Sequence, residues 1–233
     1  MPAQITELID KIDGSEAVGD MIAAILLLEL ENQQALATTA GKDPNLWKVR
    51  VFRERTNPIE DYLNLDQVQT HKPKDPSPIV NVWFDGGQFD KRTGNTVERQ
   101  KCTGRFNLDV YGHGVSHGLS TGHKPGDLDA ADNRSRALRL VRNILMSGQY
   151  TYLGDQRGAN QFIWGRWPDS ITNFQPAIDD RPVENVKACR FVLVVEFNEY
   201  APQVKGELLE LISVGVKRKE TGEVYLTANY PIT

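Results

Sequence analysis

The chain has 233 residues, of which 39% are hydrophobic and 25% charged, the composition of an ordinary globular protein that can bury a sizeable core. Its formal net charge of −4 excludes a general electrostatic attraction to nucleic acid or to anionic membranes. The longest apolar run, 22–28, is too short to cross a bilayer, and the N-terminus lacks the basic and apolar regions of a signal peptide. Cys102 and Cys189 lie far apart with no C-x-x-C pattern, so we expect buried, reduced thiols in a cytosolic protein.

The first part of the chain predicts two helices. The first covers about 5–12 and ends at Asp13 and Gly14. The second begins after Ser15, a good N-cap, and runs to about Ala40, where Gly41 ends it. Its apolar residues form a stripe wider than one helix face, which indicates contacts with more than one neighbour and partial exposure in an isolated chain.

Alternating apolar and polar residues predict strands at 47–52, 79–84 and 97–111. The second and third strands are expected to pair as a hairpin, whose charged and glycine-rich tip at 85–95 protrudes from the fold. A polar stretch at 62–78, with three prolines near its end, is expected to be an extended surface loop.

The remainder of the chain predicts one long helix and several strands. The segment 112–126, rich in glycine and histidine, is expected to be flexible, and a helix then begins at Asp127, Asp129 or Asp132 and ends at Gly148. Short strands are expected at 162–167 and 171–174. The last element is expected to be a hairpin formed by 208–217 and 223–229.

The strand at 189–200 is apolar on both faces. One face carries Phe191, Leu193, Val195 and Phe197, and the other carries Val192 and Val194. This pattern is typical of a strand inside a sheet that is covered on both sides, so we expect the residues of the first face to be nearly inaccessible to solvent.

Three histidines, His113, His117 and His123, follow Asp109 closely and could ligate zinc or manganese with it. The glycines between them make one fixed geometry costly in chain entropy, and neither a cysteine pair nor an H-E-x-x-H motif accompanies them. The pattern favours a solvated loop over a metal site.

Acidic residues on or near the predicted strands suggest a magnesium-dependent endonuclease as an alternative; they are Glu54, Asp85, Asp90 and Asp109. The Glu/Asp-x-Lys element of such enzymes is missing, and so are the G-x-S-x-G, P-loop and G-x-G-x-x-G motifs. We therefore expect no catalytic residue, no cofactor and no metal. The alternative from another class of protein is a metal-dependent nuclease, which would use Asp109 and the neighbouring histidines.

The helix at 127–147 carries arginines at positions 134, 136, 139 and 142, which could bind phosphates. Nearby acidic residues weaken that field, so a face that forms salt bridges with another protein chain is the better interpretation. Trp164 and Trp167 could stack on bases, but such tryptophans are more often core or interface anchors.

From about Arg105 onward, the order of elements resembles that of bacteriophage tail terminator proteins and of the broader group of head–tail neck, or tail completion, proteins. The segments that carry the resemblance are RFNLDVYG, ADNRSRALRLVRNILMSG, YTYLG and VKACRFVLVVEFNEYAPQ. They match in hydrophobic pattern and length and contain no catalytic signature. The N-terminal helices depart from the shorter terminators, which leaves room for a neck or collar protein on the same fold.

This interpretation predicts an α+β fold, in which a mixed or antiparallel β-sheet is flanked by α-helices and a β-hairpin protrudes. We expect a helical segment at 1–45 and a terminator-like domain at 46–233. The resemblance implies a structural virion protein that forms a cyclic homo-oligomer, a six-fold ring that caps the tail tube and joins the tail to the neck or connector. A neck/collar or head–tail adaptor protein is the alternative on the same fold.

The implied partners are other copies of the chain, the tail tube, the neck or connector protein and, as a further candidate, the sheath protein. No membrane and no sequence-specific nucleic acid is implied, although DNA can pass through the ring. The protein is expected in the tail or neck of the virion, and in the host cytoplasm during assembly. The residues expected at its interfaces are Arg134, Arg136, Arg139 and Arg142 on the helix, with Asp85, Asp90, Lys91 and Arg92 at the hairpin tip.

Overall fold

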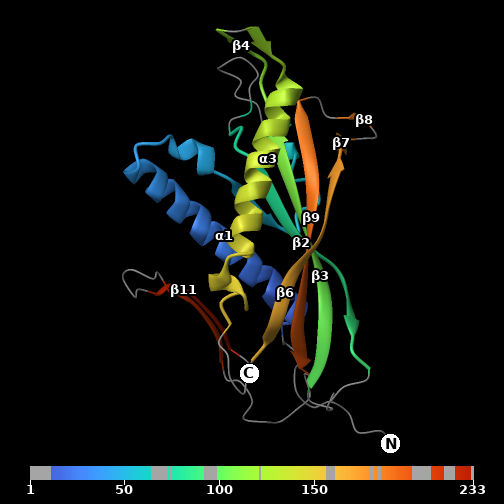
Figure 1. Cartoon of the computed structure of the whole chain (residues 1–233). Helices are drawn as coiled ribbons and strands as arrows, with labels where there is room; N and C mark the ends of the chain where they lie inside the picture. The colour runs from blue at the N-terminus through green and yellow to red at the C-terminus, as the bar shows by residue number, and fades with distance from the viewer. Residues whose placement is uncertain are drawn as a thin grey trace, which may run out of the picture.

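The computed structural model describes residues 12–63, 73, 75–91, 99–120, 122–155, 161–178, 181–182, 185–200, 211–217 and 224–231. Two long helices lie on one side of a five-stranded sheet (Figure 1). The predicted α+β fold with a mixed sheet flanked by helices is therefore confirmed. No helix in this described part of the chain is long and apolar enough to cross a membrane.

The sheet has the strand order β1-β2-β3-β9-β6. Its strands are β1 (Arg50–Arg53), β2 (Ile79–Phe89), β3 (Arg99–His113), β9 (Val186–Tyr200) and β6 (Ile163–Phe174). The strands β1 and β2 are parallel, and every other neighbouring pair is antiparallel. Because β9 lies between β3 and β6, the strand that the sequence marks as most apolar occupies the interior of the sheet.

The remaining strands form three separate two-stranded sheets. Their strands are β4 (His117–Leu119) with β5 (Gly122–Lys124), β7 (Ala177–Ile178) with β8 (Arg181–Pro182), and β10 (Leu211–Lys217) with β11 (Val224–Pro231). The last of these is the predicted C-terminal hairpin, whose two strands pair antiparallel.

The helix α1 (Gly14–Thr39) begins earlier than expected. Its N-cap is Asp13, so the prediction that Ser15 caps the helix is wrong. The backbone N–H of Asp13 donates to Glu16 Oε2 at 3.1 Å, and that of Gly14 donates to Glu199 Oε2 of β9 at 2.9 Å. This contact across the fold satisfies a donor at the helix start that a local sequence pattern leaves open.

The end of α1 agrees with the sequence. Gly41 has a φ of 66°, the left-handed conformation that glycine adopts most easily. The N–H of Lys42 donates to the carbonyl of Ala37 at 2.9 Å, and that of Gly41 donates to Thr38 at 3.1 Å. This pair of bonds is a Schellman motif, which satisfies two carbonyl groups at the helix end.

The helix α3 (Gly126–Leu145) packs directly against the end of β3. A Cβ atom at Gly112 would lie 2.3 Å from the backbone nitrogen of Arg134, and one at Gly114 would lie 2.1 Å from the carbonyl oxygen of Gly126. The glycines therefore allow close contact between two backbones. The prediction that 112–126 is a flexible segment is wrong where it includes the end of β3 and the β4–β5 hairpin.

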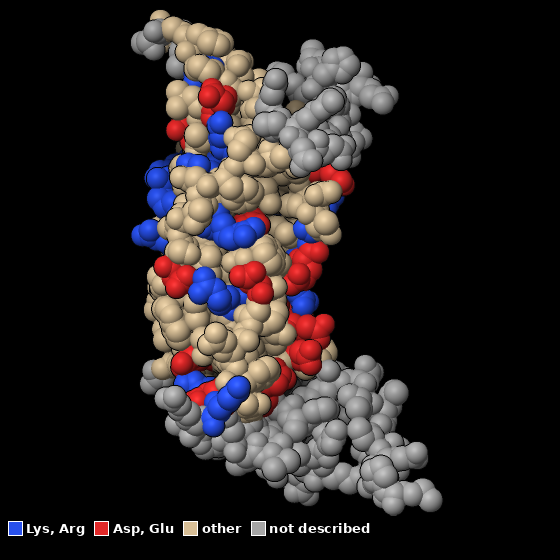
Figure 2. Space-filling model, turned by 90° about the vertical axis from the view of Figure 1, so that its right-hand side faces the viewer, with Lys and Arg blue, Asp and Glu red and all other residues tan. Residues whose placement is uncertain are grey.

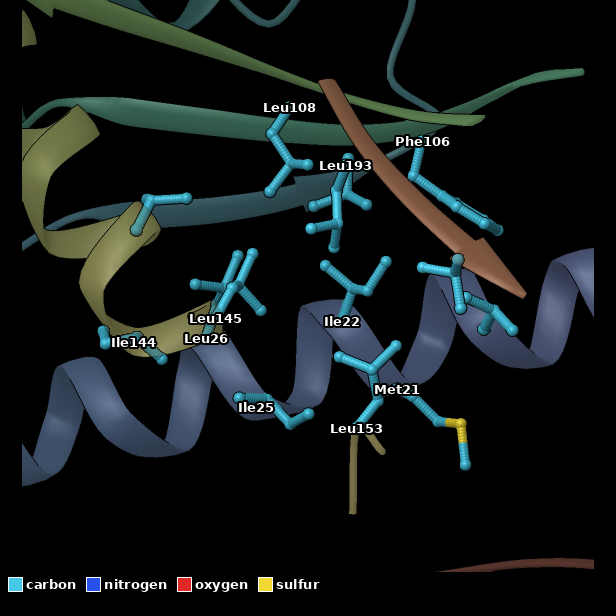
Figure 3. Close-up of a cluster of buried hydrophobic side chains, with 14 of the residues drawn as sticks. Met21, Ile22, Ile25, Leu26, Phe106, Leu108, Ile144, Leu145, Leu153 and Leu193 are labelled. Atoms are coloured by element: carbon cyan, nitrogen blue, oxygen red, sulfur yellow. The ribbon is translucent and has the colours of Figure 1, made fainter. Parts of the chain in front are cut away.

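The main core lies between the two helices and the sheet. Ile22 and Leu26 of α1 point toward Leu193 of β9, and Leu145 approaches from α3 (Figure 3). The four predicted core residues of β9, Phe191, Leu193, Val195 and Phe197, are at most 1% exposed, as expected. Cys102 and Cys189 are both buried and free, and burial raises the pKa of each thiol to about 11.

The second face of the sheet differs from the prediction, because both long helices lie on the first face. One end of the second face is covered by the short helix α2 (Glu60–Leu63) and the residues before it. Ile59 and Tyr62 pack there against Ile79, Tyr111, Val186 and Ala188. Beyond this small cluster, no helix in the described ranges lies over the second face, so β9 is not covered by helices on both sides.

Several elements have other bounds than the sequence predicts. Residues 44–47 form a 3₁₀ helix, η1 (Pro44–Trp47), so the first strand begins at Arg50 and not at position 47. A second 3₁₀ helix, η2 (Gly148–Tyr150), follows α3. β6 is one strand with two bulges, where the sequence predicted two short strands. The predicted helix at 5–12 and most of the loop at 62–78 lie outside the described residues.

Candidate interaction surface

The predicted arginine row does not form one face of α3. Arg134 Nη1 donates to Asn173 Oδ1 of β6 at 3.0 Å, toward one edge of the sheet. Arg136 turns the other way and lines a groove beside η1. Positions two residues apart differ by about 200° around a helix, so these two side chains point to opposite flanks. Arg139 and Arg142 are exposed.

The residues predicted at the hairpin tip are also separated. Asp85 lies within β2 at a bulge, where the register with β3 shifts between Phe84 and Gly86. β2 continues to Phe89, so Asp85 does not belong to the tip. Asp90 and the exposed Lys91 follow the strand, and Arg92 lies outside the described residues.

The structure does not bring Asp109 and the three histidines together. Asp109 is bound to Arg190, with its two carboxylate oxygens 2.7 and 2.9 Å from the guanidinium. The ring of His113 lies against Tyr62, with 5.2 Å between ring centroids, whereas His117 and His123 are exposed on the β4–β5 hairpin. Among the described residues no group of His, Cys, Asp and Glu is placed to hold a metal ion.

The second face of the sheet instead gathers aromatic and charged side chains. Directly paired residues of neighbouring strands point to the same face, which places Trp83, Asn107, Val192 and Ser170 in one row across β2, β3, β9 and β6. On one side of this row lies a second row, formed by Asn81, Asp109, Arg190 and Thr172. On its other side lies a third row, formed by Arg105, Val194 and Trp167.

Three of the chain's four tryptophans belong to this face. Trp83 Nε1 donates to Asp109 Oδ2 at 3.0 Å, and the guanidinium of Arg190 lies 4.7 Å from the centre of the Trp83 ring. Trp164 and Trp167 lie on the edge strand β6 and remain 44% and 40% exposed. We call these three tryptophans, together with Lys101, Arg105 and Arg190 between them, the tryptophan face.

Each cation of the tryptophan face is paired with an acid on the same face. The pairs are Lys101–Glu196 at 2.8 Å, Arg105–Asp169 at 2.8 Å and Arg190–Asp109 at 2.7 Å. The side of the molecule that faces away from α1 shows the same mixture of neighbouring basic and acidic side chains (Figure 2). The face is therefore rich in aromatic groups but close to neutral in charge.

The polar residues that the structure buries lie on this second face. They are Asn81, Asn107, Asp109 and Asn198. Both polar atoms of the Asn198 side chain are paired, because Trp164 Nε1 donates to its Oδ1 at 3.0 Å and its Nδ2 donates to the Gln161 carbonyl at 2.8 Å. Asn107 is 1% exposed, and among the described residues neither its Oδ1 nor its Nδ2 has a hydrogen-bond partner.

The unpaired amide predicts an unusual mutational result. Asn107→Val should raise the free energy of unfolding by about 1 kcal/mol, because it removes a buried polar group without a partner. Asn198→Val, on the next strand, should lower it, because it leaves Trp164 Nε1 and the Gln161 carbonyl unpaired. Urea denaturation of both variants measures the two signs. A loss of stability in both would show that Asn107 has a partner in solution.

Sequence reasoning identified only part of this surface. It gave Trp164 and Trp167 as core or interface anchors and predicted a strand at 97–111. It predicted that β2 pairs with that strand, but it could not show that β9 lies on the other side, which is what brings Arg190 to Asp109. Comparison of the sequence with models of known protein families and with curated proteins finds no match.

Proposed function

We propose that this chain is a structural assembly protein that binds other proteins through the tryptophan face. The observation that carries this proposal is a sheet face with exposed tryptophans and interspersed arginines, over most of which no described helix lies. Tryptophan and arginine are the side chains that contribute most often to the energy of protein interfaces. Trp164 and Trp167 on an edge strand are accessible to a partner without any rearrangement of the core.

The pairing of charges favours a protein partner over a nucleic acid. A sheet that stacks bases on its aromatic groups also needs free cations to follow the phosphate backbone. Here Lys101, Arg105 and Arg190 are each neutralised by an acid on the same face, and the whole chain has a net charge of −4. A partner with its own mixture of charged and apolar groups fits such a surface better than a polyanion.

A ring requires two different surfaces on each copy, because its interfaces are head-to-tail. The tryptophan face supplies one. The helical layer supplies the other, since α1 leaves Leu27 56% exposed and Leu36 50% exposed. These exposed leucines agree with the expectation that the apolar stripe of α1 is too wide for one neighbour. Two unlike surfaces on one chain, each with exposed apolar side chains, support head-to-tail association over a simple two-fold dimer.

On this basis we propose that the protein is a phage tail terminator, which forms a cyclic homo-oligomer of six copies on the end of the tail tube. The specific assignment rests on the sequence resemblance, and the tryptophan face supplies a surface for it. A neck/collar or head–tail adaptor protein would use the same surface toward the connector. In either role the chain acts without catalysis, in the virion tail or neck.

Negative-stain electron microscopy of the purified protein, alone and mixed with tail tubes, tests this proposal. We expect rings with a central hole, either free at high concentration or at one end of the tubes. Binding to purified connectors but not to tubes would favour the neck or adaptor role. A protein that stays monomeric in sedimentation at all concentrations and binds neither tubes nor connectors would contradict the proposal.

A further inference from the structure

A groove of about 440 Å³ lies on the opposite flank from the β6 edge and opens to solvent. Four parts of the chain form it: η1, the segment 75–78, the end of β3 and the first half of α3. The polar side chains in its lining include Lys48, Asp75, His113, Asp129, Asn133 and Arg136. The groove is therefore polar, unlike the core beneath it.

Most of the charged groups in this lining already have a partner. Lys48 Nζ lies 2.8 Å from Asp75 Oδ2, and Asp129 Oδ1 lies 2.9 Å from Lys124 Nζ. Partial burial would raise the pKa of Asp75, but hydrogen bonds from Lys48 and Ser77 outweigh it and lower that pKa to about 2. These two carboxylates are thus ionised, and each already binds a lysine.

Arg136 is different. Within the described ranges it is the one charged residue of the lining that forms no ion pair. Its Nη2 donates to Asn133 Oδ1 at 2.8 Å, and Asn133 Nδ2 donates in turn to the His113 carbonyl at 2.8 Å. Asn133 therefore fixes one side of the guanidinium. Partial burial has the largest effect on the pKa of Arg136 and lowers it, whereas the nearby charges of Asp129, Asp132 and Asp43 act in the opposite direction.

We propose that this groove is a carboxylate-binding site in which the free side of the Arg136 guanidinium binds the ligand. A guanidinium presents two parallel N–H donors that match the two oxygens of a carboxylate. His113 adds a further polar group, because its Nδ1 is buried and has no partner in the described part of the chain. Asp75 and Asp129 in the walls favour a singly charged carboxylate over a phosphate with two charges.

Such a carboxylate has two possible sources: an acidic side chain or chain end of another copy of this protein, or a free small carboxylate. The site itself does not depend on the proposed ring, because a free carboxylate would occupy it equally well. If another copy supplies the group, the groove also fixes the register between neighbours in the ring.

The test uses sodium acetate as the probe and the intact protein labelled with ¹⁵N. We expect acetate, but not sodium chloride at the same ionic strength, to shift the NMR signals of Gly114, Val115 and the Arg136 side chain in a saturable manner. Arg136→Gln should weaken acetate binding about tenfold or more, as read from the Gly114 and Val115 signals. Arg139→Gln is the matched control, since Arg139 is exposed on the same helix and should leave binding unchanged.

Arg136→Lys retains the charge without the two parallel donors, so its binding should be intermediate. This variant keeps the test valid if Arg136→Gln folds poorly. Absence of a saturable acetate effect in the wild-type protein, or equal binding by Arg136→Gln and Arg139→Gln, would overturn the proposal.

Sedimentation then distinguishes the two sources of the carboxylate. If another copy supplies it, acetate and Arg136→Gln should each weaken self-association, while sodium chloride at the same ionic strength should not. If the natural ligand is a free carboxylate, acetate binds in the NMR experiment and self-association is unaffected. Either result retains the site, and neither depends on whether the ring caps a phage tail.

Discussion

Replacement of Phe191 by alanine is expected to lower the free energy of unfolding by about 3–5 kcal/mol. Phe191 is fully buried on β9, and the strands on both sides of β9 hold it in place. Its side chain points into the main core beneath the two long helices. The loss combines the transfer energy of the ring with the cost of a cavity that the surrounding backbone cannot close.

Ile171→Ala is the matched control for this change. Ile171 lies directly opposite Phe191 in the ladder between β6 and β9 and points to the same face, but it is 46% exposed at the sheet edge. Its truncation should therefore cost clearly less. Urea denaturation measures both variants, and an unchanged midpoint for Phe191→Ala would show that β9 does not form the centre of the core.

The position of β9 could be predicted because burial leaves a direct trace in the sequence. Phe191, Leu193, Val195 and Phe197 occupy every second position, which is the spacing of one face of a strand, and the structure buries all four. The same pattern was misleading for the second face. Val192 and Val194 are only 6% and 5% exposed, yet the helices lie on the other side. An apolar residue shows that it is buried, but it does not show what buries it.

The beginning of α1 was not predicted, although a local pattern marks it. Asp13 and Glu16 have the spacing of a capping box, and the Asp13 N–H donates to Glu16 Oε2. Ser15, which the sequence also suggests as a cap, lies inside the helix. The side chain of Glu199, far away in sequence, accepts a hydrogen bond from the Gly14 N–H and extends the helix start. A Cβ atom at position 14 would lie 2.5 Å from the same carboxylate. A glycine that the sequence suggests as a helix breaker here permits a close tertiary contact.

The interaction surface was harder to predict than the fold because it depends on contacts between distant parts of the chain. Arginines at 134 and 136 look like one row in the sequence, but α3 directs one toward β6 and the other into the groove. The tryptophan face combines residues of β2, β3, β9 and β6, and the order of these strands in the sheet differs from their order along the chain. Trp83 and Arg190 are more than a hundred positions apart, and only the strand order β2-β3-β9 brings them together.

Simultaneous replacement of Trp164 and Trp167 by serine is expected to abolish assembly while the chain remains folded. Both side chains are about half exposed, so their loss removes little of the buried core, although it leaves Asn198 Oδ1 without the donor from Trp164. In an interface, however, a tryptophan anchor commonly contributes about 2 kcal/mol or more, which corresponds to a roughly 30-fold weaker association for each residue. Ring formation repeats the interface in every copy, so the loss multiplies around the ring.

The experiment compares the double variant with Leu128→Ser, which removes an exposed apolar side chain from α3, away from the tryptophan face. Circular dichroism should show that both variants remain folded. Sedimentation with purified tail tubes should show binding by the wild-type protein and by Leu128→Ser, and none by the double variant. Equal binding by all three would mean that the tryptophan face is not the contact surface. The proposed mode of assembly would then be wrong, even if rings were still observed.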